Sequence, residues 1–226
     1  MLCLLATFQS SGQNLFDTTR TAEKYYGDTT AYVPTKFELY IKQQVKTSLQ
    51  HSSRVILACL PGGLVPEYTN AYVIVQKYIL LSCPAEKEWV ANMYFETIDL
   101  KDNSSRFLKS SLVKISENNE LYVVSNQWDS LDRDWYLPFV QEVELNGKKG
   151  YFPSEASDIG FMNFYAIDTA GVVFKNIYGG SLIEEWSLPG ICVQNVNFAY
   201  NNTQPTFSAM IFLQKLAESK ELFLIP

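Results

Sequence analysis

Histidine is nearly absent from this sequence, which contains His51 as its one histidine. Imidazole is the side chain that most often moves protons near neutral pH, so this scarcity disfavours histidine-based acid–base catalysis. His51 lies beside Gln50, Ser52 and Ser53, and we interpret it as a solvated turn residue. Glycine loops of the GxxxxGK[ST] or GxGxxG type are absent, and Gly179-Gly180-Ser181 lacks the second half of a G-x-S-x-G elbow. We therefore predict no catalytic residues and no cofactor, so that the protein is not an enzyme.

Cysteine is also sparse and widely spaced. No two of the four cysteines form a CxxC pair, which excludes a zinc knuckle or a thioredoxin-like motif and leads us to expect no metal. We predict that they are mostly buried free thiols, because free cysteine behaves as a small apolar residue. The four are Cys3, Cys59, Cys83 and Cys192.

Excess positive charge is missing as well. The chain carries 18 basic and 24 acidic side chains, a net charge of -6, so its overall field would repel a polyanion. This disfavours a protein that grips nucleic acid. The apolar segment from Met1 to Phe8 follows no positive charge and is too short for a signal-peptide core or a membrane span. We expect no membrane association and synthesis in the cytoplasm.

Acidic residues form two small groups with possible chemistry. Asp129, Asp132 and Asp134 offer several oxygens to calcium, but their spacing departs from that of an EF-hand loop and the glycine of that loop is missing. Glu184 and Glu185 resemble the paired carboxylates of glycosidases, yet adjacent residues of a strand point to opposite faces. We interpret both groups as solvated acidic side chains.

Apolar and aromatic residues, by contrast, are plentiful. Aromatic residues make up 14% of the chain and charged residues 19%, which predicts a folded protein. Few basic residues lie among the N-terminal tyrosines, so these tyrosines suit a protein interface better than stacking on bases. They are Tyr25, Tyr26, Tyr32 and Tyr40.

The dominant sequence period is two, which indicates β-strands. Alternation at Phe37, Leu39 and Ile41 predicts one strand, and a cleaner alternation opens at Trp89. Three apolar runs predict strands that are covered on both faces, by a second layer or by a neighbouring subunit. These runs are Arg54 to Leu60, Tyr72 to Leu81 and Val172 to Tyr178.

One helix and two hairpins complete the expected pattern. Capping residues before Phe107 and a helical apolar spacing predict a helix over Ser104 to Lys114. Asp168 to Gly171 predicts the turn of a hairpin between residues 161–167 and 172–178. Alternation in residues 195–200 and 207–213 predicts an antiparallel pair near the C-terminus.

These segments suggest a domain plan. We predict an N-terminal arm over residues 1–35, a β domain over 36–213 and a C-terminal tail over 214–226. The polar stretch 116–158, with turn signals such as Asn146-Gly147, is interpreted as an insertion or elaborated loop within the domain.

The order of four segments resembles that of tail-tube proteins of contractile-tailed bacteriophages. A strand leads into Leu60-Pro61-Gly62-Gly63-Leu64-Val65 and a hairpin arm over Tyr68 to Leu81, and a strand then opens at Trp89. A helix beginning near Arg106-Phe107 comes next. The order ends in Leu188-Pro189 and a final strand over Thr206 to Ile211.

That resemblance implies a mainly β fold, an antiparallel β-sandwich or barrel with one flanking α-helix and a long β-hairpin arm. It further implies a hexameric ring whose hairpins join edge to edge into a closed inner β-barrel, and rings that stack. The implied function is a virion structural protein of the tail, forming the tube through which DNA is ejected. The longer chain leaves open the repeating tube subunit, a baseplate initiator and a terminal ring.

Within that family picture, DNA passes through the lumen without specific binding, and the implied partners are tail sheath, tape-measure and baseplate or neck proteins. We expect Gln76, Asn163 and Asn176 to face the lumen. The expected inter-subunit hairpin residues are Tyr72, Ile74, Tyr78, Val172 and Phe174.

Two alternative functions stay open. A viral capsid protein of the jelly-roll type would also be aromatic-rich and β-rich, but would lack the helix at Ser104 to Lys114. A carbohydrate-binding or hydrolytic β-sandwich would draw on Asp129, Asp132, Glu184 and Tyr151.

Overall fold

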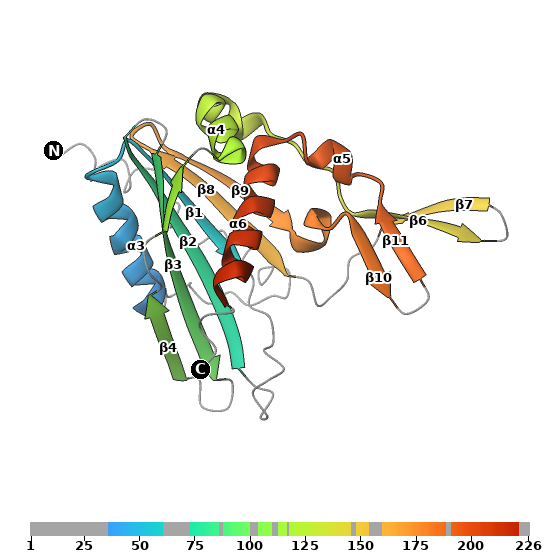
Figure 1. The fold of residues 1–226 in the computed structure, drawn as a ribbon, viewed down its shortest axis with the longest axis horizontal. Helices are drawn as coiled ribbons and strands as arrows, with labels where there is room; N and C mark the ends of the chain where they lie inside the picture. The colour runs from blue at the N-terminus through green and yellow to red at the C-terminus, as the bar shows by residue number, and fades with distance from the viewer. Residues whose placement is uncertain are drawn as a thin grey trace, which may run out of the picture.

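The computed structural model describes residues 36–60, 73–85, 88–99, 104–109, 113–116, 118–145, 148–153, 160–188 and 191–221. Its described part is mainly β, with antiparallel sheets and a few helices, as the sequence predicted (Figure 1). The N-terminal arm and residues 222–226 lie outside the described residues.

Sheet A is the larger of the two sheets and forms the body of the molecule. Its strands run in the order β4-β3-β2-β1-β8-β9, with β5 also paired to β3, and all pairs are antiparallel. The strands are β1 (Arg54–Leu60), β2 (Val73–Ala85), β3 (Glu88–Asp99), β4 (Ser104–Lys109), β5 (Val113–Ser116), β8 (Phe161–Asp168) and β9 (Val172–Tyr178).

Helices cover both faces of sheet A and make a three-layer body. Helix α3 (Lys36–Leu49) packs on one face, where its side chains join those of β1, β2 and β8. Helices α4 (Asn119–Asn126) and α6 (Pro205–Glu221), with the 3-10 turn η2 (Trp128–Arg133), pack on the other (Figure 1). We call these the α3 face and the α6 face.

The central strand β1 confirms the prediction of a strand covered on both faces. Every residue from Val55 to Leu60 is buried. The cover comes from this chain's own helices, and not from the neighbouring subunit that the sequence left as one possibility. The body therefore needs no second copy to bury its main core. The strand at Trp89 and the hairpin β8–β9 are confirmed too.

The predicted strand at Phe37 is wrong, because residues 36–49 form helix α3. Phe37, Ile41 and Val45 are buried at a spacing of four residues, while Leu39 is 50% exposed. The first five residues satisfy both a strand and a helix period, and only the longer window separates them. Glu38 in the first turn and Lys46 in the last also suit the helix dipole.

The predicted helix over Ser104 to Lys114 is also wrong. Strands β4 and β5 occupy this region and pair with successive parts of β3. The long strand β3 would otherwise leave a row of backbone groups unpaired, and the two short strands satisfy them. The "one flanking helix" of the sequence analysis is replaced by helices at other positions.

The predicted C-terminal strand pair is the third correction. Residues 198–201 form the short helix α5 (Phe198–Asn201), and residues 205–221 form α6, which includes residues 214–221 of the predicted tail. Pro205 occupies the first helical position, where its missing N–H costs nothing. Phe207, Met210 and Leu213 then pack against sheet A.

The stretch 116–158 is structured over most of its length. It contributes Leu121, Val124, Trp128 and Leu131 to the core of the α6 face. It also contains two strands of a second sheet, sheet B. The strands of sheet B are β6 (Val140–Leu145), β7 (Lys148–Pro153), β10 (Glu185–Leu188) and β11 (Ile191–Asn195).

Candidate assembly surface

Sheet B projects from one end of the body (Figure 1). Its strands run in the order β10-β11-β6-β7, and each adjacent pair is antiparallel. Among the described residues, the outer strands β10 and β7 therefore each pair on one side. A projecting sheet with two open edges can accept a further strand at either edge.

The two faces of sheet B differ in polarity. Directly opposed residues share a face, so the row Glu185, Gln194, Glu142 and Tyr151 marks a polar face. The neighbouring row places Asn195, Gln141 and Phe152 on the opposite face. Val143 and Val193 lie on that second face as well, which makes it the more apolar of the two.

Strand β7 exposes aromatic rings on both faces. Tyr151 is 59% exposed and Phe152 46% exposed. Phe152 lies over Gly150, where an added Cβ would be 2.8 Å from its ring, so glycine makes room for this arrangement. Exposed aromatic side chains on a projecting strand are typical of a protein interface.

An ion pair joins the two strands of the β6–β7 hairpin. Lys149 Nζ donates to Glu142 Oε1 at 2.6 Å, from exposed side chains. The hydrogen bond from Lys149 lowers the pKa of the Glu142 carboxyl, so this group is charged at neutral pH. The pair links diagonal positions of the hairpin, whose register is set by the backbone pairing of β6 with β7.

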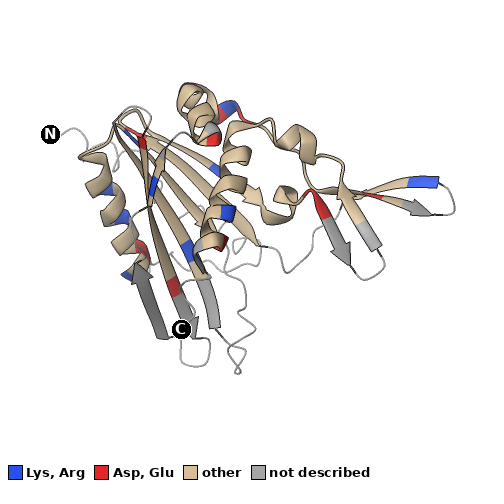
Figure 2. Ribbon diagram, in the orientation of Figure 1, with Lys and Arg blue, Asp and Glu red and all other residues tan. Residues whose placement is uncertain are grey.

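Charge differs between the two edges of sheet B (Figure 2). Strand β7 begins with Lys148 and Lys149, both exposed. Strand β10 begins with Glu185, which follows Glu184, and both are exposed. One edge is therefore basic and the other acidic.

A connecting segment, residues 134–139, anchors sheet B to the body. The buried Asn201 of α5 donates from Nδ2 to the Leu137 carbonyl at 2.9 Å and accepts from the Leu137 N–H at 2.7 Å. Asn197 Nδ2 donates to the Pro138 carbonyl at 2.8 Å. These side-chain amides replace the backbone partners that an irregular segment lacks.

Strand β9 anchors the same segment from the other side. Lys175 Nζ donates to the carbonyls of Asp132 and Asp134, each at 2.8 Å, and the Tyr136 hydroxyl donates to the Asn176 carbonyl. Burial lowers the pKa of Lys175 against the opposing effect of both aspartates, and burial raises the pKa of Tyr136. The polar groups on both sides give sheet B a defined position.

The aspartates considered for calcium have separate roles in the structure. Asp134 Oδ2 accepts from the Thr206 N–H at 3.0 Å and from its hydroxyl at 2.8 Å, which caps helix α6. Asp129 and Asp132 are exposed on η2. Within the described ranges, no group of three or more potential ligand residues could hold a metal ion.

The predicted lumen residues lie together on the α3 face of sheet A. Asn163 and Asn176 are directly opposed on β8 and β9, and Asn176 Nδ2 donates to Asn163 Oδ1 at 2.7 Å. Asn163 is buried, and Gln76 accepts a hydrogen bond from the Tyr78 hydroxyl at 3.1 Å. The three residues share a face but occupy the body, not the projecting sheet.

The predicted inter-subunit hairpin residues are spread over sheet A. Tyr78 is buried and its ring packs against Phe37 of α3, and Phe174 packs against Tyr165. Val172 is exposed. Ile74 pairs with Ile98 inside sheet A, and Tyr72 lies outside the described residues. The predicted arm Tyr68 to Leu81 is thus largely β2, an interior strand.

Other residues considered for chemistry stay apart. His51 is exposed in a turn, as predicted, and Cys59 is a buried free thiol whose pKa is raised by burial. Ser181 is buried in the 3-10 turn η3 (Gly179–Leu182). Tyr40 packs its ring edge-on against Tyr94, while Tyr25, Tyr26 and Tyr32 lie outside the described residues.

Sequence reasoning missed sheet B, although a signal was present. Asn146-Gly147 separates β6 from β7, and Asn-Gly between alternating segments is a strong short-range hairpin signal. Strand β6 shows no clear apolar–polar alternation, because Gln141, Glu142 and Glu144 are all polar.

The helices that the structure describes include none with the length and apolar composition to cross a bilayer. No family model, curated protein or solved structure matches the chain.

Proposed function

We propose that this protein is a virion structural protein that forms the phage tail tube, or a ring that continues it, by ring formation and stacking. The observation that carries the proposal is sheet B. Its outer strands have no neighbour among the described residues, and β7 exposes Tyr151 and Phe152. A monomer gains nothing from such a surface, whereas a ring would bury it.

In the proposed ring, which is hexameric, sheets B from successive copies join into a closed inner β-barrel. Closure removes all open edges. The polar face, with Glu142, Gln194 and Glu185, lines the lumen, and the apolar face turns toward the tube wall. Lys149 lies on the same face and is ion-paired with Glu142. A lumen with mainly acidic and amide side chains lets the duplex slide, since it offers phosphate few partners. The body and its helices then contact the tail sheath, tape-measure and baseplate or neck proteins.

A jelly-roll capsid protein is the second candidate, and one observation favours it. No helix forms in the described residues between 104 and 114, where the tube resemblance implies one. Sheet A argues the other way, because a jelly roll packs two sheets face to face. Here helices α3 and α6 cover the two faces of sheet A. We therefore retain the tube as the proposed function.

The carbohydrate alternative has less support. Asp129 and Asp132 lie on η2, Glu184 precedes β10 and Tyr151 lies on β7. Asp134, which would complete the acidic group, caps α6 instead.

Sedimentation velocity over a range of concentrations tests the proposal. We expect wild-type protein to form rings or stacked rings, and Y151S/F152S to remain monomeric because both exposed rings of β7 are removed. The matched control is Y122S, which removes a ring that is 55% exposed on α4, away from sheet B. Monomeric wild-type protein at high concentration would count against the proposal, and so would full assembly of Y151S/F152S.

A further inference from the structure

The open edges of sheet B carry opposite charges, and from this we propose how copies of the chain join. Strand β7 of one copy pairs with strand β10 of the next. Lys148 and Lys149 of β7, and Glu184 and Glu185 at the start of β10, select that pairing. The inference rests on the proposed function, since it names the contact by which the ring forms.

Strand direction permits this contact. In the order β10-β11-β6-β7 every neighbour is antiparallel, so β10 and β6 run one way and β11 and β7 run the other. A β10 strand from the next copy, placed beside β7, continues the alternation. The polar face also stays on one side, which a closed barrel requires.

Register brings opposite charges together on the polar face. One cross-strand row of sheet B contains Glu185, Glu142 and Tyr151. Lys149 lies on the same face, two residues before Tyr151 along β7. A level junction therefore places Tyr151 opposite the next copy's Glu185 and Lys149 diagonal to it. A stagger of two residues keeps the faces and places Lys149 directly opposite Glu185. In both registers Lys149 reaches the next copy's glutamate.

The same charges disfavour the competing contacts. Two β7 edges would bring the lysine pairs of both copies to one junction, and two β10 edges would do the same with Glu184 and Glu185. Like charges close together across a junction disfavour that pairing. A pairing of identical edges also ends at a dimer, whereas β7 with β10 is a head-to-tail contact that continues to a closed ring.

Reversing the charges of one edge of sheet B at a time tests whether these charges select the β7–β10 pairing. The variant K148E/K149E has two acidic edges, and E184K/E185K has two basic edges. For each alone we expect the dissociation constant of assembly, measured by sedimentation velocity, to rise on the order of tenfold to a hundredfold. An equal mixture of the two, and the variant carrying all four substitutions, should assemble because opposite charges meet again.

Two controls separate charge from other effects. K148R/K149R keeps the basic edge and should assemble like wild type. E142Q removes the negative charge that Lys149 contacts within the chain while it leaves both edges unchanged, and it should assemble too.

Recovery in the mixture shows that both variants are folded, so loss of assembly by each alone would then support the edge pairing. If wild-type protein assembles and both single-edge variants assemble equally well alone, the edge pairing is overturned while the tube proposal stands. If the mixture and the fourfold variant fail where wild type assembles, charge selection is likewise overturned. Monomeric wild-type protein would overturn both proposals.

Discussion

At the scale of single residues, buried asparagine side chains form hydrogen bonds with backbone groups that lie outside α-helices and β-strands. Asn201 is fully buried and forms two hydrogen bonds with the backbone of Leu137. Asn195, also buried, donates to the carbonyls of Ser181 and Ile183, each at 3.2 Å. Both side chains lie where sheet B meets the body. The position of the assembly surface thus depends on a few amide groups.

Replacing Asn201 by alanine should therefore be costly. N201A leaves the part-buried N–H and carbonyl of Leu137 without the Asn201 amide, and we expect a loss of about 1–3 kcal/mol in the free energy of unfolding. Urea denaturation measures this loss. The control N126A, at an exposed position at the end of α4, should change stability by less than about 0.5 kcal/mol. Equal effects of the two substitutions would contradict the anchoring role.

At the scale of elements, helix α3 shows how a short window misleads. Phe37, Leu39 and Ile41 alternate as in a strand, yet Ile41 is buried and Leu39 is exposed. The distinguishing residues are Gln43 and Thr47, which a strand would place on the buried face with Ile41 and Val45, and which the helix leaves exposed.

Alanine substitutions in α3 separate the two patterns. In a strand Leu39 and Ile41 would share a buried face, so L39A and I41A would cost similar amounts. In the helix I41A opens a cavity against sheet A and should cost about 2–5 kcal/mol, whereas L39A should cost less than about 1 kcal/mol. Thermal or urea unfolding of both variants gives the comparison. Similar losses would mean that α3 is wrongly placed.

The sequence allowed the central strands to be predicted, because β1, β3 and the β8–β9 hairpin depend on local apolar patterns and a local turn. Helix α6 could not be predicted so directly. Its cap comes from Asp134, which lies 72 residues away from Thr206, so no local window contains it. Strands β4 and β5 form because β3 offers an edge, which is again a tertiary effect that overrides local propensity.

At the scale of the whole molecule, the body buries its core within one copy of the chain, whereas sheet B has two outer strands that each pair on one side among the described residues. The chain's own helices cover both faces of sheet A. The predicted cover on both faces is thus supplied within the chain for β1, whereas in β9 only Ile177 is buried and that prediction is wrong. The argument for assembly moves to sheet B. Of the resemblance landmarks, the strands at Leu60 and Trp89 have the expected form, while the segments at Arg106 and Thr206 do not.

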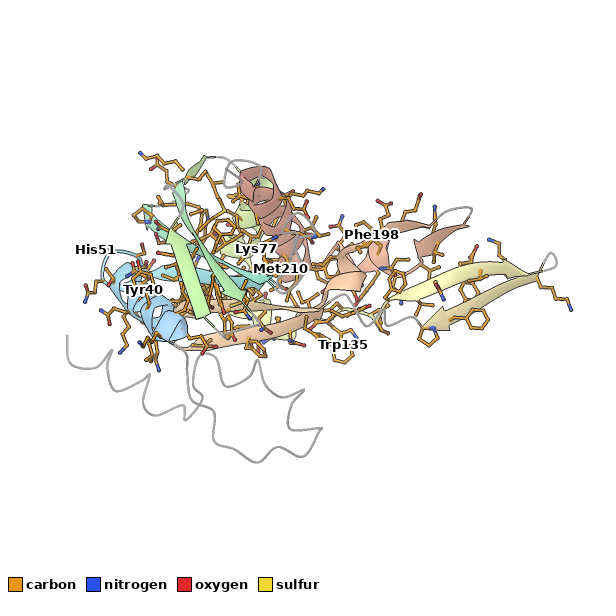
Figure 3. The ribbon with its side chains drawn as sticks, turned by 90° about the horizontal axis from the view of Figure 1, so that it is seen from below. Tyr40, His51, Lys77, Trp135, Phe198 and Met210 are labelled. Carbon is orange, nitrogen blue, oxygen red and sulfur yellow. The ribbon has the colours of Figure 1, made fainter. Side chains whose placement is uncertain are left out.

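The sequence did not predict the candidate assembly surface. Inter-subunit residues were expected in apolar segments, and the described parts of those segments form strands of sheet A. Strand β7 is short and begins with two lysines, and the exposure of Tyr151 and Phe152 has meaning only because sheet B projects from the body (Figure 3). The dipeptide Asn146-Gly147 was interpreted as a turn within an insertion, although Asn-Gly between alternating segments also favours a hairpin.

Negative-stain electron microscopy of the purified full-length chain tests the central claim most directly. The account predicts closed rings with a central opening, and short tubes where rings stack, with sheet B lining the opening. A field of separate monomers at every concentration, with no rings or tubes, would contradict it.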